Sequence, residues 1–534
     1  MFTLCGAVVS TPARDFDVAV VGSGFAGALL ARLLARHGRS VVLVERGHHP
    51  RFALGESSTP LAAIALERLA RRHGLAELGD FGSWGRWQAR QPELRCGLKR
   101  GFTFYGHRRG EPYSNSGRDE RRLLVAASPT DAVADVHWRR ADVDARFVRR
   151  AVEDGATLLE GTAILEVEPA GDGVRLAARS ETEALDLRAR FVVDASGPAA
   201  VVARALGAVE RRAVDSGPAL VYGHFAGVEP FDRAAASQSA RFESPPYPEG
   251  CAAVHHLLEN GWIYVLPFDD GVVSAGVLRR DLLANGREDL PADLLWRAAL
   301  SEAPSLAQAF RGARAVVGPQ VARGIRRRLD RAAGERWAAL PHVYAFNDPL
   351  FSTGIAWSLV AVERLTELLL DADSRALEPE RLAPGLARYR ELLSTEADHL
   401  EALVVGAERL YGDFDRFVSW SLLYFATASF CEARQRLVDP PAAGWEGFLG
   451  ADDALLAGVF ERAGRRLDEE GDPNRFATWV RETIVERDIG GFAEAGDGRR
   501  IGVDLAALVE RAGRLGLSQR EVRAALRRLR GGIF

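Results

Sequence analysis

Lysine is almost absent from this chain: of its 69 basic residues only Lys99 is a lysine, and the others are arginines. Methionine occurs once, at position 1. Such a bias replaces lysine by arginine wherever a positive charge suffices, so Lys99 is either a remnant of composition or a residue kept for its chemistry. Arginine does not lose its proton in proteins, whereas a buried lysine can, and lysine offers a compact amine. The surroundings of Lys99 must decide between these two interpretations.

Cysteine is also scarce, and no two cysteines form a Cys-x-x-Cys pair. Because no histidine cluster has metal-ligand spacing either, we expect reduced thiols and no metal site. The cysteines are Cys5, Cys96, Cys251 and Cys431.

Long apolar runs and an excess of one charge are missing as well. No stretch reaches the roughly 18 apolar residues that a membrane span needs, and the first residues lack the pattern of a signal peptide. We therefore expect a cytoplasmic protein without a membrane span. The net charge of −4, with arginines interleaved among acids, argues against a nucleic-acid partner. A chain of 534 residues fits two or three globular domains.

The most specific motif is a dinucleotide-binding unit near the start. An apolar run over 18–21 is followed by Gly-x-Gly-x-x-Gly at Gly22, Gly24 and Gly27, a helical pattern, and a second apolar run that ends in Glu45. Glycines let the backbone approach a pyrophosphate, the helix N-terminus stabilises its charge, and an acid at this distance suits a ribose diol. The predicted cofactor contacts of this unit are Gly22, Gly24, Phe25, Ala26, Gly27, Glu45 and Arg46.

Two later segments distinguish between NAD and FAD. Residues 188–198 are an apolar strand that ends at Asp194 and Gly197, and residues 342–370 are a strand, an Asp-Pro loop at Asp348 and a long helix. Similar segments occur in flavoproteins of the para-hydroxybenzoate hydroxylase type. That resemblance implies an α/β FAD-binding Rossmann-like domain in which Asp348, Gly354 and Ile355 lie near the flavin.

The segment "GESS" at 55–58, "GWIYVLPF" at 261 and "DPLFSTG" at 348 together resemble flavin-dependent halogenases, most closely the group acting on tetracycline-type aromatic polyketides. The resemblance adds Gly55, Glu56 and Ser57 to the FAD contacts. In that family a lysine follows the Gly-Glu-Ser segment, as Lys99 does here. The resemblance therefore implies that Lys99 is catalytic.

The implied reaction uses reduced FAD, supplied by a separate flavin reductase, and oxygen to convert chloride or bromide into hypohalous acid. The acid then reaches Lys99, which either hydrogen-bonds it or forms a haloamine, and the halogen passes to a small electron-rich aromatic substrate, free or attached to a carrier protein. The family's halide site corresponds to the backbone amides of Ser352, Thr353 and Gly354. Amides at a helix N-terminus suit an anion.

Two departures from the family pattern affect the substrate side. The Trp-x-Trp-x-Ile-Pro motif is written Trp262, Tyr264, Leu266 and Pro267, so its second tryptophan has become a tyrosine. A glutamate of the tryptophan halogenases is replaced by Phe351, which favours a phenolic or polyketide substrate over tryptophan. Two alternatives stay open: a flavin-dependent aromatic hydroxylase, and a halogenase-like flavoprotein without halogenating activity.

The rest of the chain predicts two domains. Residues 1–374 are expected to form a discontinuous FAD-binding domain, with a mixed substrate sheet from about 85–130 and 215–320. Residues 375–534 show helical periods and are expected to form an all-α C-terminal domain. Its aromatic positions are more typical of core, although Tyr411 and Phe414 are candidates for a substrate entrance.

Overall fold

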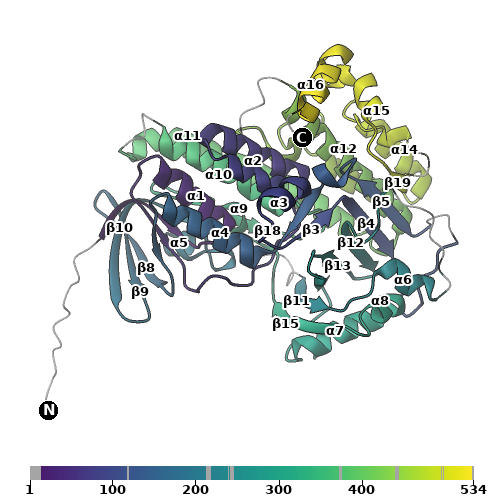
Figure 1. Cartoon of the computed structure of the whole chain (residues 1–534), viewed down its shortest axis with the longest axis horizontal. Coiled ribbons are helices and arrows are strands. Elements are labelled where there is room, and N and C mark those ends of the chain that lie inside the picture. Colours follow the sequence, from purple (N-terminus) through teal and green to yellow (C-terminus); the bar gives the residue numbers. More distant parts are fainter. Residues whose placement is uncertain are drawn as a thin grey trace.

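The computed structural model describes residues 14–116, 120–211, 218–238, 240, 246–284, 286–371, 376–438, 444–494, 496 and 498–531, with side chains to residue 528. Cys5, most of the N-terminal segment considered above and the predicted boundary at 374 lie outside these residues. Figure 1 shows two β-sheets side by side, with a layer of helices above them.

The first sheet is the predicted nucleotide-binding sheet. Its strand order is β7-β2-β1-β10-β9-β8. Strand β17 also pairs with β10, at its C-terminal residues Val192–Asp194, beyond the residues that pair with β9. The pairs among β7, β2, β1, β10 and β17 are parallel, whereas β10-β9 and β9-β8 are antiparallel. Val18–Val21 and Val41–Val44 are buried throughout, as expected of strands covered on both faces. The strands are β1 Arg14–Val21, β2 Val41–Val44, β7 Thr157–Leu159, β8 Ala163–Ala170, β9 Gly173–Arg179, β10 Ala184–Asp194 and β17 Trp337–Ala339.

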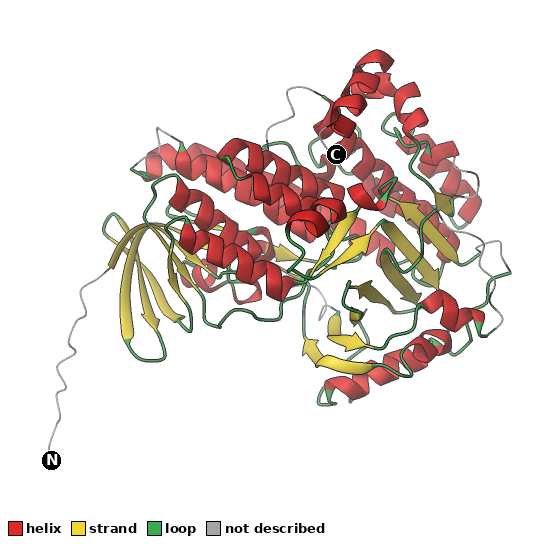
Figure 2. Cartoon of the chain, viewed as in Figure 1, coloured by secondary structure: helices red, strands yellow, loops and turns green. Residues whose placement is uncertain are grey.

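The helices of this part, red in Figure 2, form a layer in which α4, α1, α10 and α2 are successive neighbours. The first of them in sequence begins directly after Gly24, includes Gly27 of the glycine motif and ends at Arg36. The helices are α1 Phe25–Arg36, α2 Pro60–His73, α3 Trp84–Arg90, α4 Arg140–Glu153, α5 Val201–Ala205, α9 Pro341–Tyr344 and α10 Gly354–Leu370.

The second sheet has eight strands in the order β15-β11-β14-β13-β12-β4-β5-β19. All but the last lie within the two stretches expected to build a substrate sheet. Helices α6, α7 and α8 cover one face of it (Figure 1). The elements are β4 Gly101–Gly106, β5 Arg122–Ala126, β11 Ala219–Ala226, β12 Ala253–Leu258, β13 Gly261–Pro267, β14 Val272–Arg279, β15 Arg314–Ala322, β19 Arg500–Ile501, α6 Phe231–Ala236, α7 Ala292–Ser301 and α8 Pro304–Ala309.

Two short ribbons complete the strands. The antiparallel pair β3 Cys96–Lys99 and β6 Asp135–Trp138 places Lys99 directly opposite Asp135. The second ribbon pairs β16 Arg327–Arg328 with β18 Ala345–Phe346.

The C-terminal part is mainly helical, but it is not all-α as expected, because its strand β19 pairs with β5 of the second sheet. It also shares one continuous hydrophobic core with the flavin-binding part. A fully buried ion pair between Arg364 on α10 and Glu396 on α11 joins the two at 2.6 Å, and Trp357 donates its indole N–H to the same carboxylate. In the described part of the chain, no helix combines the length and apolar character of a membrane span. The helices are α11 Pro379–Glu408, α12 Phe414–Leu437, α13 Val459–Glu469, α14 Pro473–Ile484, α15 Leu505–Glu510 and α16 Gln519–Gly531.

Candidate active site

The glycine motif makes the close turn that a dinucleotide requires. Gly22 has φ +106°, and a Cβ there would lie 2.3 Å from the carbonyl oxygen of Ala195. A Cβ on Gly27 would lie 2.2 Å from the carbonyl oxygen of Gly22. At Gly24 a Cβ would meet only Arg140 and Asp144, at 3.6 Å and beyond. The first and third glycines thus pack strand, loop and helix together, and the middle one leaves its backbone approachable.

Glu45 lies next to this turn, at the end of β2. Its carboxylate accepts hydrogen bonds from the backbone and hydroxyl of Ser23, from the Gly47 amide and from Arg51. Burial acts to raise the pKa of Glu45, but the bonds from Gly47 and Ser23 and the charge of Arg51 outweigh it and lower the pKa to about 2. Glu45 is therefore ionised and able to accept ribose hydroxyls, whereas the adjacent Arg46 is exposed.

Arg140 and Asp144 are a functional pair that sequence reasoning missed. Arg140 donates to both carboxylate oxygens of Asp144, at 2.8 and 2.9 Å, and to the carbonyl oxygen of Leu54 at 2.6 Å. Asp144 Oδ1 also accepts the amide of Phe25 at the start of α1. The pair places a guanidinium beside the glycine turn, where a pyrophosphate needs positive charge. Because arginine is so frequent in this chain, nothing in the sequence distinguishes Arg140 from the other arginines.

Asp194 shapes the site indirectly. One oxygen accepts the amide and hydroxyl of Ser196, and the other accepts the amides of Val202 and Ala203. With both oxygens engaged by the protein, Asp194 holds the turn against which Gly22 packs. The predicted contact of Asp194 with the cofactor stays a prediction. Gly197, at φ +63°, occupies the same turn.

The residues of the Gly-Glu-Ser segment contact different parts of the molecule. Gly55, at φ +86°, is exposed and faces Arg140. The carboxylate of Glu56 is buried and lies 3.1 Å from His224 Nε2 on the second sheet. Ser57 forms a backbone bridge with His137 of β6. Glu56 thus contacts the substrate sheet in this structure, and its predicted FAD contact stays a prediction.

The loop before α10 presents free amides at a helix N-terminus. Ser352 has φ +55°, uncommon for a residue other than glycine, and its amide donates to the carbonyl oxygen of Pro349 at 2.9 Å. Within the described residues no acceptor contacts the amides of Thr353 and Gly354. The halide site predicted from three amides therefore has two of them available.

His342 is a second residue that the sequence did not single out. A Cβ on Gly354 would lie 2.7 Å from His342 Nε2, so the imidazole faces the first turn of α10. Burial, followed by the charges of Arg327 and Arg140, lowers its pKa to about 3. A neutral imidazole therefore lies beside the α10 N-terminus, where Ile355 is also buried.

Asp348 connects this loop to the second sheet. Its carboxylate accepts the indole N–H of Trp262 at 3.2 Å and the amide of Leu350 at 2.8 Å. Burial raises the pKa of Asp348 to about 7, and the charge of Glu408 adds to the effect. The predicted contact of Asp348 with FAD stays a prediction, because the structure shows the carboxyl engaged with protein donors.

The amine of Lys99 is fully buried. Nζ donates to the carbonyl oxygen of Ser58 at 2.6 Å and lies 4.0 Å from the ring centroid of Phe102. Burial lowers the pKa of Lys99 to about 7, and the charge of Asp135 acts to raise it. The lysine is therefore not a solvated surface residue, and its proton can be exchanged near neutral pH.

Aromatic side chains line the face of the second sheet beside Lys99. The His255 ring stacks on Phe102 and Phe104, with ring centroids 5.9 and 4.7 Å apart. The ring of Trp262 lies 5.2 Å from that of His255. From the opposite side Phe351 packs on Tyr424 of α12 at 4.6 Å, and the Tyr424 hydroxyl donates to the Phe351 carbonyl oxygen. Tyr411 and Phe414 are buried at the start of α12.

Tyr264 occupies the position of the second motif tryptophan. Its ring lies 6.0 Å from that of Trp262, and it faces Gly276 on β14, where a Cβ would lie 2.6 Å from the hydroxyl oxygen. Tyr264 is buried in the core, and the motif ends at Pro267 on the same strand. The small Gly276 provides the room into which this side chain extends.

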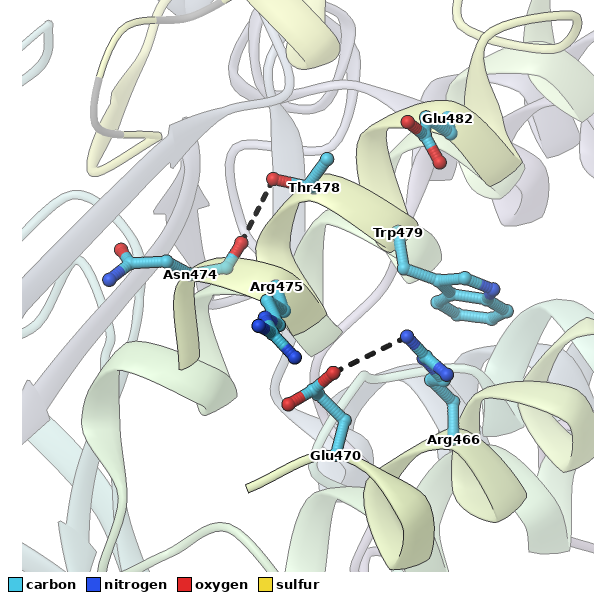
Figure 3. Close-up of a pocket in the computed structure, with 7 residues that line it drawn as sticks. All are labelled: Arg466, Glu470, Asn474, Arg475, Thr478, Trp479 and Glu482. Atoms are coloured by element: carbon cyan, nitrogen blue, oxygen red, sulfur yellow. Dashed lines mark hydrogen bonds and ion pairs between the residues drawn. The ribbon is translucent and has the colours of Figure 1, made fainter. Parts of the chain in front are cut away.

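A surface hollow of about 360 Å³ lies elsewhere, between α13 and α14. Figure 3 shows Glu470 paired with Arg466 and Trp479 at one side of this open, charged hollow. Its residues belong to neither the glycine turn nor the Lys99 region. We place the active site at the buried groups above, because they combine an ionisable amine, an aromatic lining and a dinucleotide turn. Among the described residues no group of histidine, cysteine or acidic side chains could hold a metal ion.

A family model described as "FAD dependent oxidoreductase" matches residues 17–354, more than half of the chain, and the chain belongs to that family. It is an enzyme of the flavin oxidoreductase type, with FAD as its cofactor. The residues fit that group, since two glycines pack tightly at the turn while Gly24, Gly55 and Arg140 line its open side.

The resemblance to halogenases is confirmed by the relatives. The chain is 28% identical over 395 residues to tetracycline 7-halogenase of Kitasatospora aureofaciens, covering 71% of this chain and 69% of the relative. It is 28% identical over 409 residues to monodechloroaminopyrrolnitrin halogenase PrnC of Pseudomonas fluorescens, covering 75% and 69%. The structure of halogenase PltM in complex with phloroglucinol and FAD superposes with a TM-score of 0.78 at 23% identity, covering 91% of this chain and 99% of PltM. The shared fold agrees with the predicted fold class.

Proposed function

We propose that this enzyme is a flavin-dependent halogenase that chlorinates or brominates an electron-rich aromatic compound through Lys99. The observation that carries the proposal is the position of the chain's only lysine: a buried amine beside Phe102, on the aromatic face that Phe351 and Tyr424 oppose. Phenols and polyketides fit this lining because their rings are already activated and apolar contacts suffice to hold them.

The FAD site in this proposal runs from the glycine turn to α10. Glu45 accepts the ribose hydroxyls, Arg140 and the α1 N-terminus neutralise the pyrophosphate, and His342 and the α10 N-terminus hold the flavin end. Bound FAD would be reduced by a separate flavin reductase. Together with oxygen it would supply the oxidant that converts halide into hypohalous acid. The amides of Thr353 and Gly354 bind the halide. We expect the reductase and this enzyme to meet in the cytoplasm, where reduced nicotinamide is available.

Lys99 then binds the hypohalous acid and orients its halogen toward the ring of the substrate. The aromatic layer between Lys99 and Trp262 excludes water, which would otherwise consume the acid or let it diffuse away. The substrate is a small aromatic molecule, free or attached to a carrier protein. Similar proteins support both kinds of substrate. One relative is a chlorinase of a pyrrole carried by a peptidyl carrier protein, and the structure of PltM was solved with the free phenol phloroglucinol.

The test is a product assay. The enzyme, a flavin reductase, FAD, NADH and oxygen are incubated with chloride or bromide and a panel of phenols and aromatic polyketides, and products are analysed by mass spectrometry. We expect monohalogenated products whose isotope pattern follows the halide supplied. Hydroxylated products alone would favour the aromatic hydroxylase, for which Tyr264 at the tryptophan position is the supporting observation. No product from any member, with FAD bound, would favour the flavoprotein without halogenating activity.

A further inference from the structure

We propose that Asp135 is a positioning residue that keeps a proton on Lys99, so that Lys99 acts as an ammonium hydrogen-bond donor toward hypohalous acid. The inference rests on the proposed function of Lys99 and adds the group that sets its charge. No motif in the sequence marks Asp135, which lies 36 residues after the lysine.

The first observation is the register of the β3–β6 ribbon. Lys99 and Asp135 are directly paired across this antiparallel ribbon, so their side chains leave the same face and begin about 5 Å apart. Both side chains are buried, with exposed fractions of 0% and 3%. A lysine and an aspartate placed together in an apolar environment are each other's natural counter-charge.

The second observation is that both groups keep unused hydrogen-bonding capacity, because no hydrogen bond or close ion pair joins them directly in the described part of the chain. The Lys99 ammonium has three N–H donors, and among the described residues only the carbonyl oxygen of Ser58 accepts from it. Asp135 Oδ2 is buried without a hydrogen-bond partner in the same part of the chain. A buried, poorly solvated ammonium would lose its proton if it stood alone, so the carboxylate is the group that retains it.

The other ionisable groups around the pair do not take over this role. His137 on β6 and His255 on β12 face Lys99, but burial, followed by the charge of Lys99, lowers the pKa of each to about 3, so both are neutral. From α12, Glu432 and Arg436 act on Asp135, and they largely compensate each other through their own ion pair. Asp135 in turn raises the pKa of the Tyr424 hydroxyl, after burial, so this phenol stays protonated.

Burial also raises the pKa of Asp135 to about 7, with the Lys99 charge acting to lower it. Burial therefore acts against the charge of both groups, while each charge favours the other, so the two groups titrate as a coupled pair. With the proton on Lys99, two of its N–H groups remain for a ligand oxygen. This favours the hydrogen-bonded form of hypohalous acid over a haloamine.

The single lysine makes the inference directly measurable. The full-length FAD-bound enzyme, produced with [13C,15N]lysine and a lysine-free tag, gives one side-chain ε-methylene signal by NMR, and its pH titration reports the pKa of Lys99. Because the opposing charge is removed, Asp135→Asn is expected to lower that pKa by about one to two units. Asp135→Glu is expected to restore it, and Glu432→Gln is the matched control, since Glu432 acts on Asp135 but not on Lys99.

A second measurement links the pair to turnover. In Asp135→Asn the pH at which halogenation of a phenol falls by half is expected to move down by the same amount as the NMR titration, while formation of free hypohalous acid, followed with a small diketone trap, stays unchanged. A Lys99 titration that is the same in wild type and Asp135→Asn, or a wild-type midpoint near 10, would overturn the inference. If Asp135→Asn lowers the Lys99 pKa as expected but the wild-type enzyme forms no halogenated product, only the proposed function would be overturned.

Discussion

The indole N–H of Trp262 donates a hydrogen bond of 3.2 Å to Asp348, and this bond ties strand β13 of the substrate sheet to the loop that begins α10. The loop carries the two free amides proposed to bind halide, so the position of that site depends on a residue of the other sheet.

Replacing Trp262 by Phe removes the donor and leaves a buried carboxyl with one hydrogen bond fewer. We expect a loss of about 1–3 kcal/mol in the free energy of unfolding, measured by urea denaturation, together with a raised KM for halide. Trp479→Phe, in the open hollow between α13 and α14, is the control and should change neither quantity. An unchanged KM for halide in a destabilised Trp262→Phe enzyme would show that halide binding does not depend on the bond between Trp262 and Asp348.

Replacing Lys99 by Arg keeps the positive charge but removes an amine that can exchange its proton near pH 7. We expect at least a hundredfold loss of halogenated product, with the FAD absorbance of the purified enzyme retained. Lys99→Met, a similar volume without charge, should lose activity equally. Wild-type activity in either variant would show that Lys99 is a remnant of composition.

Replacing Tyr264 by Trp restores the family's motif. A larger ring must fit against Gly276, where the tyrosine already fills the space. If this strand separates flavin from substrate, the variant should keep its activity and convert a larger fraction of the reduced flavin into halogenated product. The measurement is product formed per NADH consumed, and a rise in hydroxylated product would contradict this view of β13.

Replacing Arg364 by Met breaks the fully buried pair with Glu396 and leaves an unpaired carboxylate in the core. We expect destabilisation by about 3–5 kcal/mol, because a single buried charge lacks compensation. The double variant Arg364→Met with Glu396→Gln should recover part of that loss. Thermal unfolding followed by circular dichroism measures both, and equal losses in the single and double variants would argue against the pair as the anchor of α11.

Acid should unfold the protein through its buried histidines. Burial lowers the pKa of His107, His137, His255 and His342 to about 3, against 6.5 in the unfolded chain. Between these values the unfolded state binds more protons, so stability is present above pH 6.5 and is lost as the pH falls toward 3. Each such histidine contributes up to about 1.4 kcal/mol per pH unit.

The urea midpoint should therefore drop between pH 6.5 and 4.5, but less than the four histidines alone imply, because Asp135 and Asp348, with pKa values raised to about 7, favour the folded state over the same range. His255→Gln, which removes one of these groups, should reduce the slope of stability against pH. A midpoint that is flat over this range would mean that these histidines are already protonated in the folded enzyme.

The local parts of this protein could be predicted from the chain alone. The strand, glycine turn and helix at 18–36 follow from short-range rules: buried apolar runs make parallel strands, and only glycine tolerates the close contacts at Gly22 and Gly27. The order of the motifs also sufficed to recognise the family, and the bias against lysine drew attention to Lys99.

The partners of those residues were decided by the tertiary structure. Asp135, Arg140 and His342 carry no motif, and each becomes significant only because a distant segment lies beside it: Lys99, the glycine turn and Gly354. The four protein donors of Asp194 likewise come from the turn and helix that follow its strand, and no motif indicated them. Sequence patterns report which chemistry is present and which local structures form, whereas the electrostatics of a buried group depends on charges brought close by folding, and those are not encoded at any fixed spacing.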